Sequence, residues 1–96
     1  MYALNNITTN NDYTQANTLV CPQTIKVNLT IANAAVYVQM ADPSPGIVGG
    51  AGAFRPEVFM PPGYYNLARR VEQVRARSAV PNAPAQITIE ALTPYD

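Results

Sequence analysis

The segment from Thr24 to Ile31 alternates between polar and apolar side chains and narrows what this chain can fold into. The apolar positions are Ile25, Val27, Leu29 and Ile31, and the polar ones are Thr24, Lys26, Asn28 and Thr30. Successive side chains of a β-strand point to opposite faces, so this period of two predicts a strand with one buried and one solvated face. A second alternating run follows, with Val36, Val38 and Met40 separated by Tyr37 and Gln39. With a turn at residues 32–34, the two runs predict a β-hairpin.

The composition favours the same class of structure. The chain has 96 residues, enough for one domain, and contains nine prolines and five glycines but only twelve charged residues. This balance is typical of short strands joined by turns rather than of a helical bundle, which is richer in Glu, Lys and Leu. We therefore expect an all-β fold.

The stretch from Phe54 to Val80 turns a corner at Pro61-Pro62-Gly63. Proline fixes φ and glycine admits positive φ, so this tripeptide predicts a reversal after a strand from Phe54 to Met60. Pro56 indicates an edge position or a bulge in that strand, because proline donates no ladder hydrogen bond.

The segment from Asn66 to Val80 fits two periods. Leu67, Val71 and Val74 have helical spacing, whereas alternation from Glu72 onward indicates a strand. We favour a strand from Val71 to Val80. Residues 64–70 are left as a strand or a helical turn.

Two further segments complete the expected domain. The run from Asp42 to Ala53 is rich in glycine and proline and predicts a surface loop. A turn at Asn82-Ala83-Pro84 precedes a last alternating strand from Gln86 to Ala91. The fold prediction is a small antiparallel β-sandwich or flattened barrel over residues 24–96. Its predicted core is Ile25, Val27, Leu29, Ile31, Val36, Val38, Val58, Val74, Ile87 and Ile89.

Residues 1–23 predict an extended N-terminal arm. They are rich in Asn, Thr and Gln, with Asp12 as the only charged side chain. Their apolar residues are too sparse to offset the ~1–2 kcal/mol per residue of backbone ordering entropy. We expect contacts with another chain to order the arm; a disordered tail is the alternative.

The residues offer little for catalysis. The chain has no histidine, one cysteine, and six carboxylates, each interpreted as a solvated surface charge. Cys21 is expected to be a small, half-buried apolar residue. We find no nucleophile motif, phosphate-binding loop or zinc ligand set, and expect a protein that is not an enzyme and needs no metal or cofactor.

The strongest candidate for a binding surface is a group of arginines and tyrosines after the corner: Arg69, Arg70, Arg75, Arg77, Tyr64 and Tyr65. On a strand, Arg75 and Arg77 project from the same face. Arginine suits bidentate contacts to carboxylates, as protein interfaces use them; a solvated outer face is an equal alternative.

Nucleic acid and membrane partners are not expected. The net charge is zero, and in the sequence no aromatic residues are interleaved with the arginines. The N-terminal segment lacks the features of a signal peptide, and no apolar run approaches the ~20 residues of a membrane span. We therefore expect synthesis in the cytoplasm.

The region from Ala34 to Leu92 resembles small β-sandwich structural proteins of tailed bacteriophages, of the head-decoration, cement or tail-accessory type. The resemblance lies in A-V-Y-V-Q-M, R-P-E-V-F-M-P-P-G, V-R-A-R-S-A-V and P-A-Q-I-T-I-E-A-L. It implies a non-enzymatic, homo-oligomeric virion protein, made in the host cytoplasm, that stabilises the head by contacts with other virion proteins, the major capsid protein first. No catalytic or ligand-binding residues come with it.

Two alternatives remain open. One is a tail or baseplate accessory protein. The other is a carbohydrate- or peptide-binding β-sandwich module, for which Tyr37, Tyr64 and Tyr65 would have to form an aromatic platform.

Overall fold

The computed structural model describes residues 1–44 and 47–95, with side chains described outside residues 43–53. The described residues form nine strands and one short 3-10 turn, η1. In chain order these are β1 (Tyr2–Thr8), η1 (Gln15–Asn17), β2 (Thr18–Val20), β3 (Lys26–Ala32), β4 (Val36–Ser44), β5 (Ile47–Phe54), β6 (Val58–Met60), β7 (Gly63–Leu67), β8 (Gln73–Ser78) and β9 (Ala85–Leu92).

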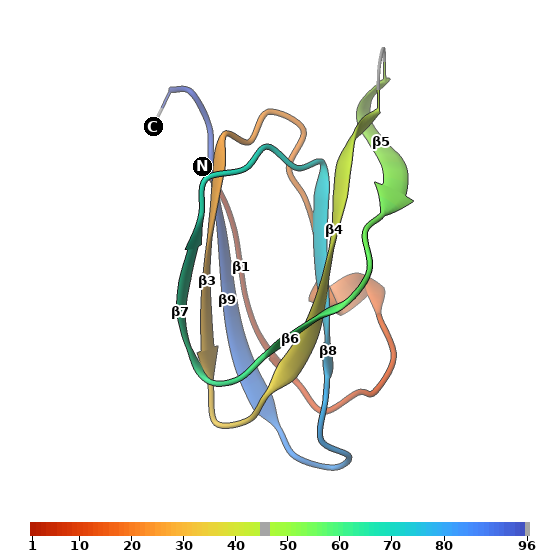
Figure 1. Ribbon diagram of the computed structural model, residues 1–96, viewed down its shortest axis with the longest axis vertical. Helices are drawn as coiled ribbons and strands as arrows, with labels where there is room; N and C mark the ends of the chain where they lie inside the picture. The colour runs from red at the N-terminus through yellow and green to blue at the C-terminus, as the bar shows by residue number, and fades with distance from the viewer. Residues whose placement is uncertain (45–46, 96) are drawn as a thin grey trace.

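The strands form two antiparallel sheets that pack face to face. Sheet A has the order β1-β9-β3-β7, and sheet B has the order β2-β8-β4-β5, with β6 also paired to β4. Figure 1 views the sandwich edge-on, with sheet A on the left and β4 and β8 of sheet B on the right. The predicted all-β sandwich is confirmed; the sheets do not close into a barrel.

The alternation that predicted the strands also places the core. Val27, Leu29 and Ile31 on β3 face Ala91, Ile89 and Ile87 of β9 in register, and all six side chains are buried. Across the sandwich lie Val36, Val38, Met40, Val74 and Ala76 of sheet B. Cys21 joins this core as a fully buried free thiol, and burial raises its pKa.

Two predicted core residues are wrong. Ile25 precedes β3 by one residue and is 51% exposed, because the strand it was assigned to begins only at Lys26. Val58 pairs with buried Val38 but is 45% exposed, because β6 is a three-residue edge strand that leaves one side uncovered. The other eight predicted core residues are buried.

The predicted loop from Asp42 to Ala53 is also wrong. β4 continues to Ser44 and pairs with β5, with register shifts around Pro43. Of the predicted loop, residues 45–46 lie outside the described residues. This hairpin extends past the other strands at one end of the sandwich (Figure 1). Glycine and proline are tolerated there because the pairing is irregular and lies at a sheet edge.

The region around the Pro61-Pro62 corner follows the prediction in part. The strand expected from Phe54 to Met60 is reduced to β6, because Phe54 ends β5 and residues 55–57 are not in a strand. The strand β7 follows the corner, which settles the open choice for residues 64–67. The strand expected over residues 71–80 appears as β8, Gln73–Ser78, and the helical alternative does not form. Asn33 and Asn82 adopt positive φ at the two predicted turns, a conformation that asparagine tolerates.

The segment predicted as an arm, residues 1–23, is extended but lies along the domain's own sheets. β1 pairs with β9 over seven positions, and β2 pairs with β8 over three. Buried Asn17 donates from Nδ2 to the Thr8 hydroxyl at 2.6 Å and accepts a hydrogen bond from Asn6. Hydrogen bonds between polar side chains therefore help to hold this segment in place, beside the apolar contacts of Tyr2, Leu4 and Leu19 with the core. Its expected contact with another chain stays a prediction.

Candidate functional site

The outer face of sheet B carries a cluster of aromatic and arginine side chains, which we call the aromatic–arginine face. It consists of Tyr13, Tyr37, Phe54, Phe59, Arg75 and Arg77. Arg75 and Arg77 alternate on β8 with buried Val74, Ala76 and Ser78, so both point outward, as predicted. Tyr37 on β4 is the register partner of both Arg77 on β8 and Phe59 on β6. Tyr13 comes from the connection between β1 and β2, and Phe54 from the end of β5.

Guanidinium groups and rings are stacked across this face. The Arg75 guanidinium lies 3.6 Å from the centre of the Phe54 ring and 4.4 Å from that of Tyr13. Arg77 lies 4.4 Å from the centre of the Tyr37 ring. Tyr37 and Phe59 meet edge to face, with ring centres 5.6 Å apart. The ring quadrupoles attract the guanidinium charges, which fixes side chains that would otherwise be mobile on a sheet surface.

Glu57 links three segments at one side of the face. Arg77 donates to both Glu57 oxygens, from Nε at 2.7 Å and from Nη2 at 2.9 Å, and the Tyr13 hydroxyl donates to Oε1 at 2.8 Å. Arg77 also donates from Nη1 to the backbone oxygen of Asn11 at 3.1 Å. The connection that carries Glu57, the β1–β2 connection and β8 are therefore held together at one carboxylate.

These contacts shift the acidities of the groups involved. Hydrogen bonds from Arg77 and Tyr13 lower the pKa of Glu57, since they favour its charged form. Burial raises the pKa of Tyr13 to about 12, and its hydrogen bond to the Glu57 carboxylate adds to the shift. The Glu57 carboxylate in turn raises the pKa of Arg77. All three groups thus keep their ordinary charge states at neutral pH.

Arg75 has a different environment from Arg77. Its Nε and Nη2 donate to the neutral Gln39 amide oxygen at 2.9 and 2.6 Å, and its plane is clamped between Phe54 and Tyr13. The positively charged, half-buried Arg75 side chain is therefore held in place, but its Nε and Nη2 are not bonded to a carboxylate.

The other predicted site residues lie elsewhere. Arg69 donates to the Asp42 carboxylate at 2.6 Å, and Arg55 binds the same carboxylate at 3.0 Å. Arg69 therefore stabilises the base of the β4–β5 hairpin. Tyr64 is exposed on β7 of sheet A. Tyr65, also on β7, packs partly against the core and donates to the Pro61 oxygen at 2.7 Å. The three tyrosines of the suggested platform, Tyr37, Tyr64 and Tyr65, therefore do not converge.

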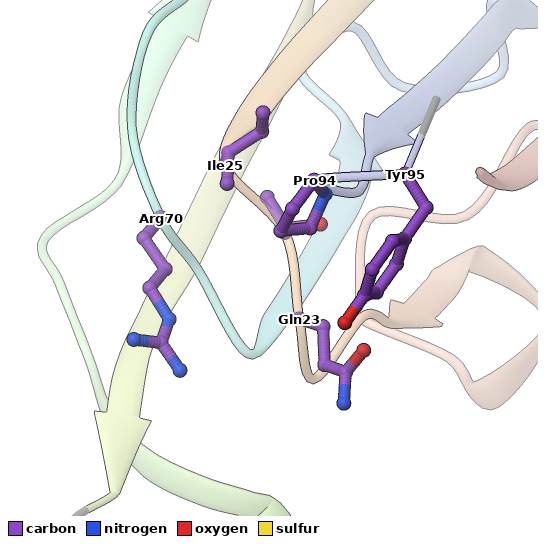
Figure 2. Close-up of a pocket in the computed structure, with 6 residues that line it drawn as sticks. Gln23, Ile25, Arg70, Pro94 and Tyr95 are labelled. Atoms are coloured by element: carbon purple, nitrogen blue, oxygen red, sulfur yellow. The ribbon is translucent and has the colours of Figure 1, made fainter.

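Arg70 lines a shallow hollow of about 290 Å³. Figure 2 shows Arg70 on one side and Tyr95 on the other, with Ile25 and Pro94 between them. Gln23 and Thr24 complete the lining. The hollow brings together one guanidinium, one amide and one phenol, and no acid–base pair.

One carboxylate departs from the expected pattern. Glu72 is 2% exposed, whereas all six carboxylates were interpreted as solvated. It does not line the hollow. Within residues 1–44 and 47–95, no group of three or more His, Cys, Asp or Glu side chains is arranged to hold a metal ion.

Sequence reasoning missed Tyr13, Phe54, Phe59 and Glu57. Tyr13 lies in a segment without periodicity, Phe54 is the last residue of β5, and Phe59 is the middle residue of the three-residue strand β6, so only the fold brings them near β8. The premise that no aromatic residues accompany the arginines holds along the sequence but not in space. The expectation that nucleic acid is not a partner stays a prediction.

Comparison with known proteins gives no relative. No protein-family model, no curated protein and no solved structure matches this chain. Within the part of the chain that the structure describes, no helix is long and apolar enough to cross a membrane.

Proposed function

We propose that this chain is a structural subunit of a tailed-bacteriophage virion, a decoration or cement protein that stabilises the head by binding its major capsid protein. The resemblance over residues 34–92 provides the virion setting. The aromatic–arginine face supports the mode of action, because rigid tyrosine, phenylalanine and arginine side chains are enriched where proteins bind each other.

One observation carries the choice of surface. Phe59 is 57% exposed and is the register partner of Tyr37, which also pairs with Arg77. Single exposed apolar residues are common, but this one contacts a cluster of fixed aromatic and arginine side chains on the same face. A partner that covers Phe59 would remove apolar surface from water and reach Arg75 with a carboxylate at the same time.

The test is binding of the purified protein to capsids that lack it. We expect Phe59→Ser to weaken capsid binding at least tenfold, as for loss of an aromatic interface anchor. Val80→Ser is the matched control, because Val80 is 45% exposed in the turn after β8, outside the face. Circular dichroism should show both variants folded.

The location in the particle decides between the related proposals. Cross-linking mass spectrometry of purified virions should join this chain to the major capsid protein. Cross-links only to tail or baseplate proteins would replace head decoration by the tail-accessory role. A chain absent from virions, with a saccharide or peptide bound near Tyr64, would overturn the proposal.

A further inference from the structure

The open edge of sheet A at β1 is unprotected against pairing with another strand. β1 is the terminal strand of that sheet, pairs with β9 over seven positions without a register shift, and contains no charged residue, proline or glycine. The other sheet edges differ: β2 and β6 are only three residues long, β7 follows Pro61-Pro62 and precedes Arg69, and β5 pairs irregularly. Charges, prolines and bulges are the usual protection of edge strands, and β1 has none of them.

The side chains of β1 leave apolar surface for a further strand to cover. Tyr2 and Leu4 point inward and pack against the core, yet remain only half-buried at the terminal strand of the sheet. Ala3, Asn5 and Ile7 alternate with them on the outer face and are exposed. A strand added beside β1 with an inward apolar residue opposite Leu4 would complete this burial.

The backbone of β1 indicates which part of the edge is available. The Ile7 amide donates to the Asn6 side-chain oxygen at 2.9 Å, and the Asn6 amide group donates to the Ala16 oxygen at 2.8 Å. The Asn6 side chain therefore occupies the edge in the C-terminal half of β1, where it already satisfies the Ile7 amide. In an antiparallel ladder alternate residues direct their amides to the same side, so Ala3 and Asn5 face the open edge together with Ile7.

We propose that β1 pairs antiparallel with β1 of a second copy of this chain, about a two-fold axis at Leu4. Ala3 of one copy then lies opposite Asn5 of the other, which makes four N–H···O bonds, and the two Leu4 side chains meet at the axis. A second copy is a suitable partner for two reasons. The uncharged edge meets no like charge when it pairs with itself, and the second copy supplies an inward-facing Leu4 opposite the first. Sheet A becomes continuous across the dimer. This inference rests on the fold and is independent of any role in a virion.

The first test is the molar mass in solution, measured by light scattering after size exclusion. We expect a dimer for the native sequence. Asn5→Pro removes two of the four intermolecular hydrogen bonds. Within one copy it removes only an amide that faces the open edge and does not pair with β9, so we expect the dissociation constant to rise about tenfold or more. A native chain that stays monomeric at high concentration overturns the inference, as does a dimer that Asn5→Pro leaves unchanged in a folded variant.

The second test does not depend on tolerance of proline. Facing residues of a non-hydrogen-bonded antiparallel pair have Cα atoms about 4.5 Å apart, within the range for a disulfide. Leu4→Cys should therefore form a disulfide-linked dimer on mild oxidation. Leu67→Cys is the matched control, because Leu67 is an inward, half-buried leucine on the opposite edge strand, β7. Native Cys21 is fully buried and should not cross-link. Failure of Leu4→Cys to cross-link, or equal cross-linking through Leu67→Cys, contradicts the proposed pairing.

Discussion

Arg75 and Arg77 are two residues apart on the same face of one strand, yet their neighbours give them different roles. Arg77 uses Nε and Nη2 on Glu57 and Nη1 on the Asn11 oxygen, so its hydrogen-bonding capacity serves the protein's own structure. Arg75 is held by two rings and a neutral amide. We therefore expect Arg77 to stabilise the face, and we propose Arg75 as the arginine that contacts a partner.

The Glu57 contacts predict a specific pH dependence of stability. Because the pKa of Glu57 is lowered in the folded protein, its contribution is present above the unfolded value of about 4.3 and is lost as pH falls through the folded value. We expect Glu57→Gln to lower the melting temperature at pH 7. The difference from the native protein should shrink as pH falls below about 4. Thermal unfolding, followed by circular dichroism at several pH values, measures this difference in melting temperature between Glu57→Gln and the native protein.

Glu90→Gln provides the control for this experiment. Glu90 lies on β9 of sheet A, away from the aromatic–arginine face, and the substitution removes the same charge. A pH-dependent difference of equal size in Glu90→Gln would show that net charge, rather than the contacts of Glu57 with Arg77 and Tyr13, causes the effect.

At the scale of elements, the connection between β1 and β2 shows how a polar sequence can fold without an apolar core of its own. Asn17 is 3% exposed at the end of η1 and bonds to Thr8 and Asn6 of β1. Further along, the Ser78 amide donates to the Asn10 oxygen at 2.7 Å. The Asn and Thr residues that suggested an arm are therefore hydrogen-bonding partners across two strands and a turn.

Asn17→Ala should measure the contribution of this network. The substitution removes the hydrogen bonds of Asn17 with the Thr8 hydroxyl and the Asn6 amide, which keeps its bond to the Ala16 oxygen, so the loss should be about 1–3 kcal/mol. Urea denaturation should show this loss in the free energy of unfolding. Asn66→Ala, at an exposed position of β7, should change it by less than about 0.5 kcal/mol. Equal effects of the two substitutions would mean that the network contributes nothing specific.

The same elements show what the sequence could predict. Strands β3, β4, β8 and β9 alternate clearly because one face of each is core and the other is solvated, so their class, faces and most core residues followed from periodicity. β5 was missed because its glycines and irregular pairing erase alternation. β1 was missed because its outward residues include Ile7 and its inward ones include Asn6. The aromatic–arginine face required contacts between residues far apart in sequence, and only its arginine pair was visible beforehand.

For the whole molecule, the edge strands decide how well the core is closed. The fully buried side chains are aliphatic or small, and no aromatic residue within the described part of the chain is among them. Larger side chains cover the margins from the edge strands, among them Tyr2, Leu4, Leu19, Tyr65 and Leu67. A domain of this size buries only about two-thirds of the surface its unfolded chain exposes, so these partly buried residues are a substantial share of its stability.

Deletion of residues 1–8 tests this view against an arm that is dispensable for the fold. The deletion removes the half-buried Tyr2 and Leu4 side chains, at about 1 kcal/mol each, and the Thr8 partner of Asn17, at about 1–2 kcal/mol. It also opens the edge of β9, whose inward side chains are almost fully buried. We expect the melting temperature of the dilute protein to fall by about 10–20 °C. Deletion of residues 95–96 is the control, since Tyr95 is 88% exposed and should change it little. A melting temperature unchanged by loss of residues 1–8 would show that β1 is not a stabilising strand of the sandwich and would leave contacts with other chains as its remaining role.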